Sequence, residues 1–142
     1  MTQPSPHEVA ERLVAEAPDE SWLRALTDDL DRRVRVAPLE RLLTLWGLSA
    51  SEAARAFGVS RQALSKWRRD GVPADRAPAL ADLAAATDML DRRIKRERIP
   101  AVVRRAAANL EGRSLYDLAG AGRHAQVREA VALMFDLRRA QP

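Results

Sequence analysis

The sequence predicts an all-α fold, and three features of its composition and patterning support this prediction. Helix-favouring residues dominate, since Ala, Leu, Arg and Glu are abundant while the 142 residues include only six glycines. Apolar residues recur at intervals of three and four along most of the chain. No window alternates apolar and polar residues in the way a half-buried strand does. We therefore expect helices throughout, packed as one domain or as two small domains that share a core.

The chain contains no cysteine, so no disulfide can form, which agrees with a reducing compartment. The first residues, MTQPSPHEVAERL, lack the apolar stretch of a signal peptide. No later run approaches the ~20 apolar residues of a membrane span. We expect a soluble, cytoplasmic protein that has no membrane partner.

Two helices are predicted within residues 1–36, after a frayed end at residues 1–6. The first runs from His7 to Ala17, where Pro18 closes it. The second begins with acidic residues in its first turn. This segment carries 8 acidic and 5 basic residues, so phosphate would repel it, and we expect it to pack against the following helices or against a second subunit. The apolar side of the second helix is formed by Trp22, Leu23, Leu26 and Leu30.

A further helix is expected to start at Pro38, because proline suits the first turn of a helix. Gly47 ends it. Its apolar stripe consists of Leu39, Leu42, Leu43 and Trp46.

The stretch from Ser49 to Gly71 predicts two short helices joined by a tight turn, a helix-turn-helix. Ser49 and Glu52 have the spacing of a capping box at the start of the first helix. Gly58 follows that helix where the chain must turn, and Ser60 is placed to cap the second helix. The small Ala54 allows the two helices to cross closely. The inner faces are formed by Ala53, Ala54, Phe57, Val59, Leu64 and Trp67.

The second helix keeps a polar outer side made of residue types that bind bases and phosphates. Gln62 can pair with adenine, and Arg61 or Arg69 with guanine. Ser49, Ser51, Ser60 and Arg68 are better placed for phosphates. A solvated helix face is the alternative interpretation, but the caps, the turn and the inner face all fit the motif together. The predicted DNA-binding residues are Ser49, Ser51, Ser60, Arg61, Gln62, Ser65, Lys66, Arg68 and Arg69.

The pattern A-x-x-x-G-V-S from Ala54 to Ser60, followed by Leu64 and Trp67, resembles the helix-turn-helix of phage-repressor and Xre-type regulators. This resemblance covers about a sixth of the chain. It implies a lambda-repressor-like helical domain.

After the motif, Gly71 and Pro73 end one helix and begin another, whose apolar residues recur from Leu80 to Ile94. The charged run from Arg92 to Arg98 is expected to be a salt-bridged helix end and is left out of the site. A boundary near residues 95–99 follows. We therefore predict a helix-turn-helix DNA-binding domain at 37–98 and a small C-terminal helical domain for dimerisation or partner binding at 99–142.

Three helices are expected in the C-terminal domain. The first runs from Ala101 to Leu110 and ends at Gly112, and the second is very short and begins with the S-x-x-acid pattern at Ser114. The last helix runs from about Arg123 to Arg139. Arg138 and Arg139 lie near its C-terminus, which is the negative end of the helix dipole. The apolar side of this last helix is formed by Val127, Ala130, Val131, Met134 and Leu137.

The stretch from Asn109 to Leu118, followed by glycines and a closing helix, resembles the C-terminal toxin-binding domain of Xre/MbcA/ParS-type antitoxins. In that family Pro follows the position of Ser114, where this chain has Leu115, and a Trp-Leu pair stands upstream. The resemblance implies that the C-terminal domain pairs subunits and neutralises a NAD-consuming toxin of the RES type. It also implies that the helix-turn-helix represses the operon.

No pattern of catalytic residues is present. His7 and His124 are the only histidines and neither has a partner by spacing, so a surface role is expected for His124. No His or Cys pair has metal-ligand spacing. We expect no enzymatic activity, no metal and no cofactor. Trp22, Trp46 and Trp67 lie in apolar stripes, which favours core packing over base stacking.

Two functions remain. The first is a sequence-specific DNA-binding repressor that acts as a homodimer on double-stranded DNA, and it is expected to be the antitoxin of a toxin-antitoxin pair. The second is a protein-binding adaptor, in which the helix-turn-helix is a scaffold and the C-terminal helices sequester a partner such as a toxin. Net charges of −3, +3 and +4 for residues 1–36, 37–71 and 72–142 do not by themselves indicate nucleic-acid binding, which is inferred from the motif.

Overall fold

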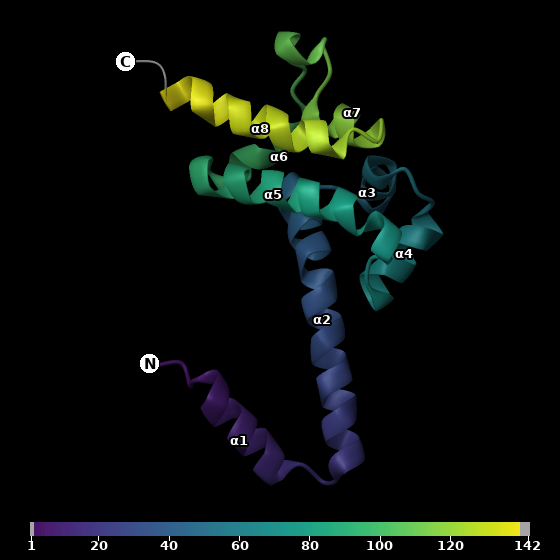
Figure 1. Cartoon of the computed structure of the whole chain (residues 1–142), viewed down its shortest axis with the longest axis vertical. Helices are drawn as coiled ribbons and strands as arrows, with labels where there is room; N and C mark the ends of the chain where they lie inside the picture. Colours follow the sequence, from purple (N-terminus) through teal and green to yellow (C-terminus); the bar gives the residue numbers. More distant parts are fainter. Residues whose placement is uncertain (1, 140–142) are drawn as a thin grey trace. The chain divides into compact units, whose positions relative to one another are not determined.

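The structure, a computed structural model, describes the backbone of residues 2–139 and the side chains of residues 2–136. Within these residues the chain forms α-helices and short 3₁₀ turns without any strand, so the predicted all-α class is confirmed (Figure 1). The helices are α1 Pro6–Glu16, α2 Glu20–Trp46, α3 Ala50–Phe57, α4 Arg61–Asp70, α5 Ala77–Arg93, α6 Ile99–Arg104, α7 Leu115–Gly120 and α8 His124–Arg139. In the described part of the chain, no helix combines the length and the apolar character that crossing a membrane requires.

The chain divides into two compact units, Met1–Val34 and Arg35–Pro142. Helix α2 begins in the first unit and ends in the second. The first unit has a well-capped start, because Ser5 and Glu8 form a reciprocal capping box at α1. No side chain between residues 2 and 34 is buried. Trp22 is 39% exposed, so its predicted place in the core is wrong.

Helix α2 continues through Pro38, which was expected to start a separate helix. Proline removes one backbone donor, and the carbonyl that loses its helical partner belongs to Val34. Val34 is exposed, so water can take the place of the missing donor. The second half of α2 is apolar on one side and enters the core as predicted. Its buried residues are Leu39, Leu42, Leu43, Leu45 and Trp46.

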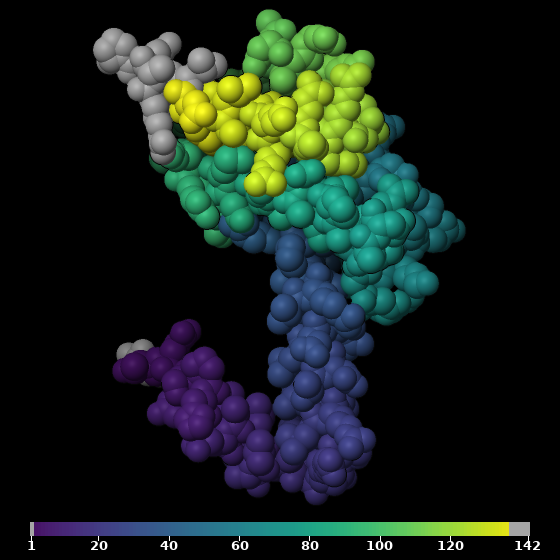
Figure 2. All heavy atoms as spheres, viewed as in Figure 1, coloured from purple at the N-terminus to yellow at the C-terminus, as the bar shows by residue number. Residues whose placement is uncertain are grey.

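The second unit has one core, which the predicted segments 37–98 and 99–142 share. Helix α8 packs along α5, and α7 packs between α3 and α8 (Figure 1). The side chains of α8 lie directly against those of α5 on the surface as well (Figure 2). The predicted boundary near residue 98 therefore separates two sequence segments but not two cores. The α8 residues buried against this core are Val127, Ala130, Val131 and Phe135, and the side chains of Leu137, Arg138 and Arg139 lie outside the described ones.

The centre of the core contains one buried polar pair. The indole N–H of Trp46 donates to Thr87 Oγ1 at 3.0 Å, and the Thr87 hydroxyl donates to the Leu83 carbonyl at 2.7 Å. Both polar groups are thus satisfied, which removes the cost of burying them. The pair fixes α2 against α5.

The helix predicted from Ala101 to Leu110 is shorter than expected. Helix α6 ends at Arg104, and the chain continues in an extended conformation from Arg105. A tight loop then closes through Ala107 and Arg113, whose backbones pair at 3.1 Å. The loop satisfies these backbone groups without a helix. The capping box at the start of α7, formed by Ser114 and Asp117, is present as predicted.

Candidate nucleic-acid interface

The start of α3 is fixed by the predicted capping box. The Ser49 hydroxyl accepts from the Glu52 backbone N–H at 3.2 Å, and Glu52 Oε1 accepts from the Ser49 N–H at 3.0 Å. Ser51 is exposed in the first turn of the same helix. The Ser49 O–H remains able to donate a further hydrogen bond, since capping uses only its acceptor.

The connection between α3 and α4 is three residues long. Gly58 adopts a left-handed conformation with a φ of +65°, which a glycine takes without a steric penalty. The Val59 N–H donates to the Ala54 carbonyl at 3.0 Å, and the Ser60 hydroxyl accepts from the Ala63 N–H at 3.1 Å. Both predicted caps are therefore confirmed, and the turn has a defined geometry.

The inner faces of α3 and α4 are packed together. Ala54, Phe57, Leu64 and Trp67 are all buried, as predicted. The Phe57 and Trp67 rings meet edge to face, with centroids 5.5 Å apart at an angle of 80°. Burial of these large side chains locks the rotation of α4 about its own axis. The opposite side of α4 must then face solvent.

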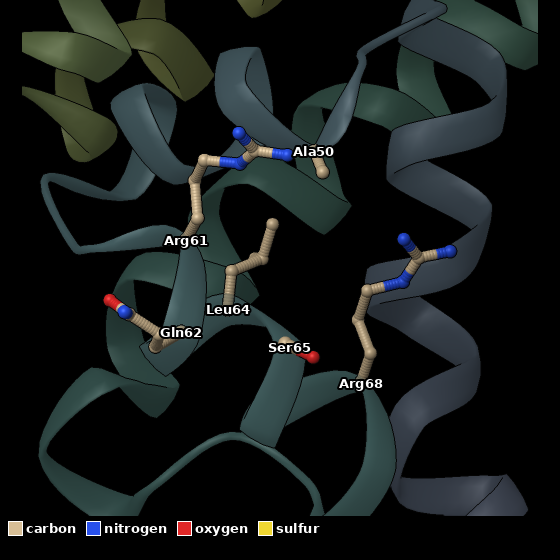
Figure 3. A pocket seen from close by; sticks show the side chains of 6 residues that line it. All are labelled: Ala50, Arg61, Gln62, Leu64, Ser65 and Arg68. Carbon is tan, nitrogen blue, oxygen red and sulfur yellow. The ribbon is translucent and has the colours of Figure 1, made fainter.

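Five polar side chains of α4 form this solvent-facing side, which we call the outer face. Three of them, Arg61, Gln62 and Ser65, line an open hollow of about 580 Å³ together with Ala50, Leu64 and Arg68. Figure 3 shows Arg61, Gln62 and Ser65 standing around the Leu64 side chain, with the Arg61 guanidinium extending toward Ala50. No acidic residue lies in the first turn of α4. The residues of the outer face are Arg61, Gln62, Ser65, Lys66 and Arg69, and all five are exposed.

Arg68 is held by a carboxylate that the sequence analysis did not identify. Its Nε and one terminal nitrogen donate to Glu40 Oε1 and Oε2 at 2.6 and 3.0 Å (Figure 3 shows the guanidinium directed toward α2). This pairing with Glu40 raises the pKa of Arg68 above its ordinary value. The charge of Arg68 is therefore largely neutralised within the chain. Arg69 is different, because among the described side chains its one ion pair is with Asp70, at a loose 3.6 Å.

Helix α3 is anchored at its start by Arg104 of α6. The guanidinium donates to the Trp46 carbonyl and the Gly47 carbonyl, each at 2.8 Å, and to Glu52 Oε2 at 3.1 Å. One cation thus satisfies carbonyls at the end of α2 and the capping carboxylate of α3. The Tyr116 hydroxyl of α7 adds a bond to the Glu52 carbonyl at 3.2 Å.

The end of α3 is anchored by His124, the first residue of α8. Its Nε2 lies 2.9 Å from the Ala56 carbonyl, so this nitrogen carries the proton, since a carbonyl can only accept. The ring also stacks on Phe57 at 6.1 Å. The predicted surface role of His124 is therefore wrong. Arg76 supplies a further donor to the Phe57 carbonyl at 3.3 Å.

The charged run after α5 behaves as a salt-bridged helix end, as predicted. Arg96 donates to both oxygens of Asp91 at 2.8 and 3.2 Å, and Arg41 of α2 also binds Asp91. These bonds lower the pKa of Asp91, with Arg96 as the main cause. Among the residues that the structure describes, no cluster of three His, Cys, Asp or Glu side chains could hold a metal ion.

Three comparisons were made with known proteins. Neither the protein-family models, nor the curated proteins, nor the solved structures gave a match to this chain.

The capping carboxylate of Glu52 should make stability depend on pH. Its pKa is lowered, first by the Ser49 backbone N–H and second by Arg104. A lowered pKa means that the ionised carboxylate stabilises the folded state above its ordinary pKa, and that this contribution is lost as the pH falls through the folded-state pKa. We expect Glu52→Gln to lower the free energy of unfolding at roughly pH 7 and to have little effect at about pH 3.

Chemical denaturation of both proteins at the two pH values measures this effect. Arg104→Met is the matched comparison, because it removes the Arg104 hydrogen bond to Glu52 and leaves the hydrogen bond from the Ser49 backbone N–H. It should reduce the pH dependence less than Glu52→Gln does. An equal effect of Glu52→Gln at both pH values would contradict the proposed role of the ionised carboxylate.

Proposed function

We propose that this chain is a sequence-specific DNA-binding regulator, acting as a repressor, and that α3 and α4 are its helix-turn-helix. The observation that carries the proposal is the outer face of α4. It brings Arg61, Gln62, Ser65, Lys66 and Arg69 to one exposed side of a helix whose opposite side is buried. Arg and Gln are the residues that hydrogen-bond base edges in the major groove, and Lys and Ser reach phosphates.

The capped helix starts add to this proposal. Ser49 and Ser51 lie at the start of α3, and Ser60 lies at the start of α4. Free backbone N–H groups at a helix start favour an anion such as a DNA phosphate. In this arrangement α4 enters the major groove, while the start of α3 contacts the DNA backbone. We propose double-stranded DNA as the partner, a homodimer as the active form, and no catalytic role or cofactor.

Arg61→Ala and Gln62→Ala should each relax the preference at one base pair of every half-site. A bidentate base contact contributes about 1–3 kcal/mol of discrimination, so the selectivity at that position should fall by roughly tenfold or more. The measurement is selection of bound DNA from a random pool, followed by affinity titration on the selected site and on single-base variants. Arg113→Ala, which removes an exposed cation from the loop before α7, is the control and should leave base preference unchanged.

One outcome would exclude α4 as the helix that contacts the base edges. If Arg61→Ala, Gln62→Ala and Lys66→Ala all bind the selected sites with unchanged affinity and preference, another surface binds the DNA.

The Glu40–Arg68 ion pair generates a second prediction. Glu40→Gln removes the carboxylate that neutralises Arg68 and frees one cation beside the outer face. We expect tighter binding to all DNA sequences, and a salt dependence of log K that is steeper by about 0.9, the value for one added phosphate contact. Binding measured over a series of salt concentrations tests this. The double variant Glu40→Gln with Arg68→Ala should lose the gain, and a gain that persists there would rule out Arg68 as its source.

A second candidate function is the binding of a partner protein, such as a toxin, by the C-terminal helices. Leu133 on α8 favours it, because this large apolar side chain is 58% exposed. It lies between Ala132 and the partly buried Met134. Ala132 lines a small hollow of about 210 Å³, whose other lining residues are Met89, Arg92, Arg93, Phe135 and Asp136. The two functions are compatible, and together they would describe an antitoxin that also represses its own operon.

Leu133→Arg should abolish co-purification with a co-expressed toxin candidate from the neighbouring reading frame. The expected cause is a charge placed in an apolar contact. DNA binding should remain, since Leu133 lies outside the α3–α4 pair. Retention of the partner by Leu133→Arg would exclude this face of α8, and Glu129→Arg, on another exposed position of the same helix, is the control.

A further inference from the structure

A hollow of about 500 Å³ at the end of α5 has four cationic side chains in its walls. Its size lies within the range of small-molecule binding sites. The lining comes from the last residue of α5, from the connection that follows it, and from α6 and the residue after α6. No acidic residue of the described part of the chain lines it. The cationic lining residues are Arg93, Lys95, Arg98 and Arg105.

The segment around this hollow carries more positive charge than the chain neutralises. Residues 92–105 include seven basic residues and one acidic residue. Two of the seven are paired, because Arg96 binds Asp91 and Arg104 binds Glu52. Among the described side chains, no ion pair joins any of the four cations of the hollow to a carboxylate. The four charges therefore repel one another, and an anion that binds between them relieves this repulsion.

The backbone that carries these cations is fixed by the core. Ile99 and Val103 of α6 are fully buried, so the orientation of this short helix is determined. The Arg98 N–H donates to the Lys95 carbonyl at 2.9 Å, which closes the turn between α5 and α6. An anion would thus bind cations on a backbone that is already ordered, and little backbone entropy would be lost.

The hollow also presents an apolar surface. Ile94, Ala101 and Val102 line it between the cations. Ile94 and Val102 pack against the core and remain partly exposed, and Ala101 is exposed. A bare phosphate would leave this surface in contact with water, whereas a ligand with an apolar or planar part would cover it. The lining therefore favours an organic phosphate over an inorganic one.

The hollow is separate from the outer face of α4. Helix α5 begins beside α4 and leads away from it (Figure 1). Its 17 residues span about 25 Å, and Arg93 is the last of them. A ligand in the hollow therefore lies at the end of α5 that is remote from α4.

We propose that this hollow binds a nucleoside di- or triphosphate. The guanidinium groups of its three arginines can each donate to two phosphate oxygens, and the Lys95 ammonium adds a point charge. The nucleoside covers the apolar lining. The inference goes beyond the proposed function and does not rest on it, because no residue of the α3–α4 pair lines this hollow.

Titration calorimetry of the full chain with ATP, at low ionic strength and with EDTA present, tests the proposal. Arg98→Gln and Arg105→Gln should each weaken ATP binding by about tenfold, and the double variant by about 100-fold, because each removes charge-assisted hydrogen bonds. Arg113→Gln removes an exposed arginine outside the hollow and should leave the affinity unchanged. The proposal is wrong if the unmodified chain does not bind ATP, if the double variant binds it equally well, or if Arg113→Gln weakens binding as much.

Two further ligands identify which part of ATP is recognised. AMP has fewer phosphate charges and should bind roughly tenfold more weakly or worse. Inorganic triphosphate has the charges without the nucleoside, and it should bind several times more weakly than ATP. Equal affinities for ATP and inorganic triphosphate would overturn the assignment of a nucleotide.

A DNA duplex of unrelated sequence is the last ligand. If it displaces ATP, and if the double variant weakens its binding, the hollow binds DNA phosphates and the nucleotide proposal is wrong. If ATP binds as expected while Arg61→Ala and Gln62→Ala leave DNA selection unchanged, the nucleotide site stands and the reading role of α4 fails. If α4 determines DNA selection but ATP does not bind, the reading role stands and the nucleotide site fails.

Discussion

The guanidinium of Arg104 is the interaction on which the geometry of the second unit depends. It reaches the last carbonyls of α2 and the capping carboxylate of α3 at the same time, at distances of 2.8 to 3.1 Å. Helix ends leave carbonyls without partners, and a buried or half-buried end needs a donor from elsewhere. Arg104 supplies that donor from a segment more than fifty residues away. The direction in which α3 leaves α2 is thus set by a residue of α6.

The position of α4 follows from that of α3. Gly58 and the cap at Ser60 determine where α4 begins, and the contact of Phe57 with Trp67 determines which side of α4 is buried. The outer face is consequently presented on a backbone of fixed geometry, so little backbone freedom remains to be lost when a ligand binds. Arg68 differs from the residues of the outer face, because Glu40 of the same chain already pairs with its guanidinium.

Features that depend on neighbouring residues could be predicted from the sequence. The caps at Ser49, Ser60 and Ser114 and the turn at Gly58 are local, because each joins groups within a few residues, and all of them are present. The burial of Leu64 and Trp67 follows from helical spacing. These local rules predicted the positions of α3 and α4. They also predicted which residues of α4 are exposed on the side opposite its buried face.

Features that depend on distant partners could not be predicted in this way. The Glu40–Arg68 pair joins residues 28 apart, and the contact between His124 and Ala56 joins residues 68 apart, so no spacing rule includes them. Pro38 was misread because proline suits the first turn of a helix, and the sequence around it does not show that the preceding turn is already helical. Trp22 was misread because an apolar stripe indicates that a face needs covering, but not whether the same chain covers it.

The His124 side chain couples the position of α8 to that of α3. His124 is the first residue of α8, its imidazole donates to the last turn of α3, and its ring stacks on Phe57. A displacement of α8 along its axis therefore cannot leave the end of α3 unchanged. Any coupling free energy by which a ligand on α8 changes the affinity at the α3–α4 pair would change the affinity on α8 by the same amount when the α3–α4 pair is occupied, because thermodynamic coupling between two sites is reciprocal.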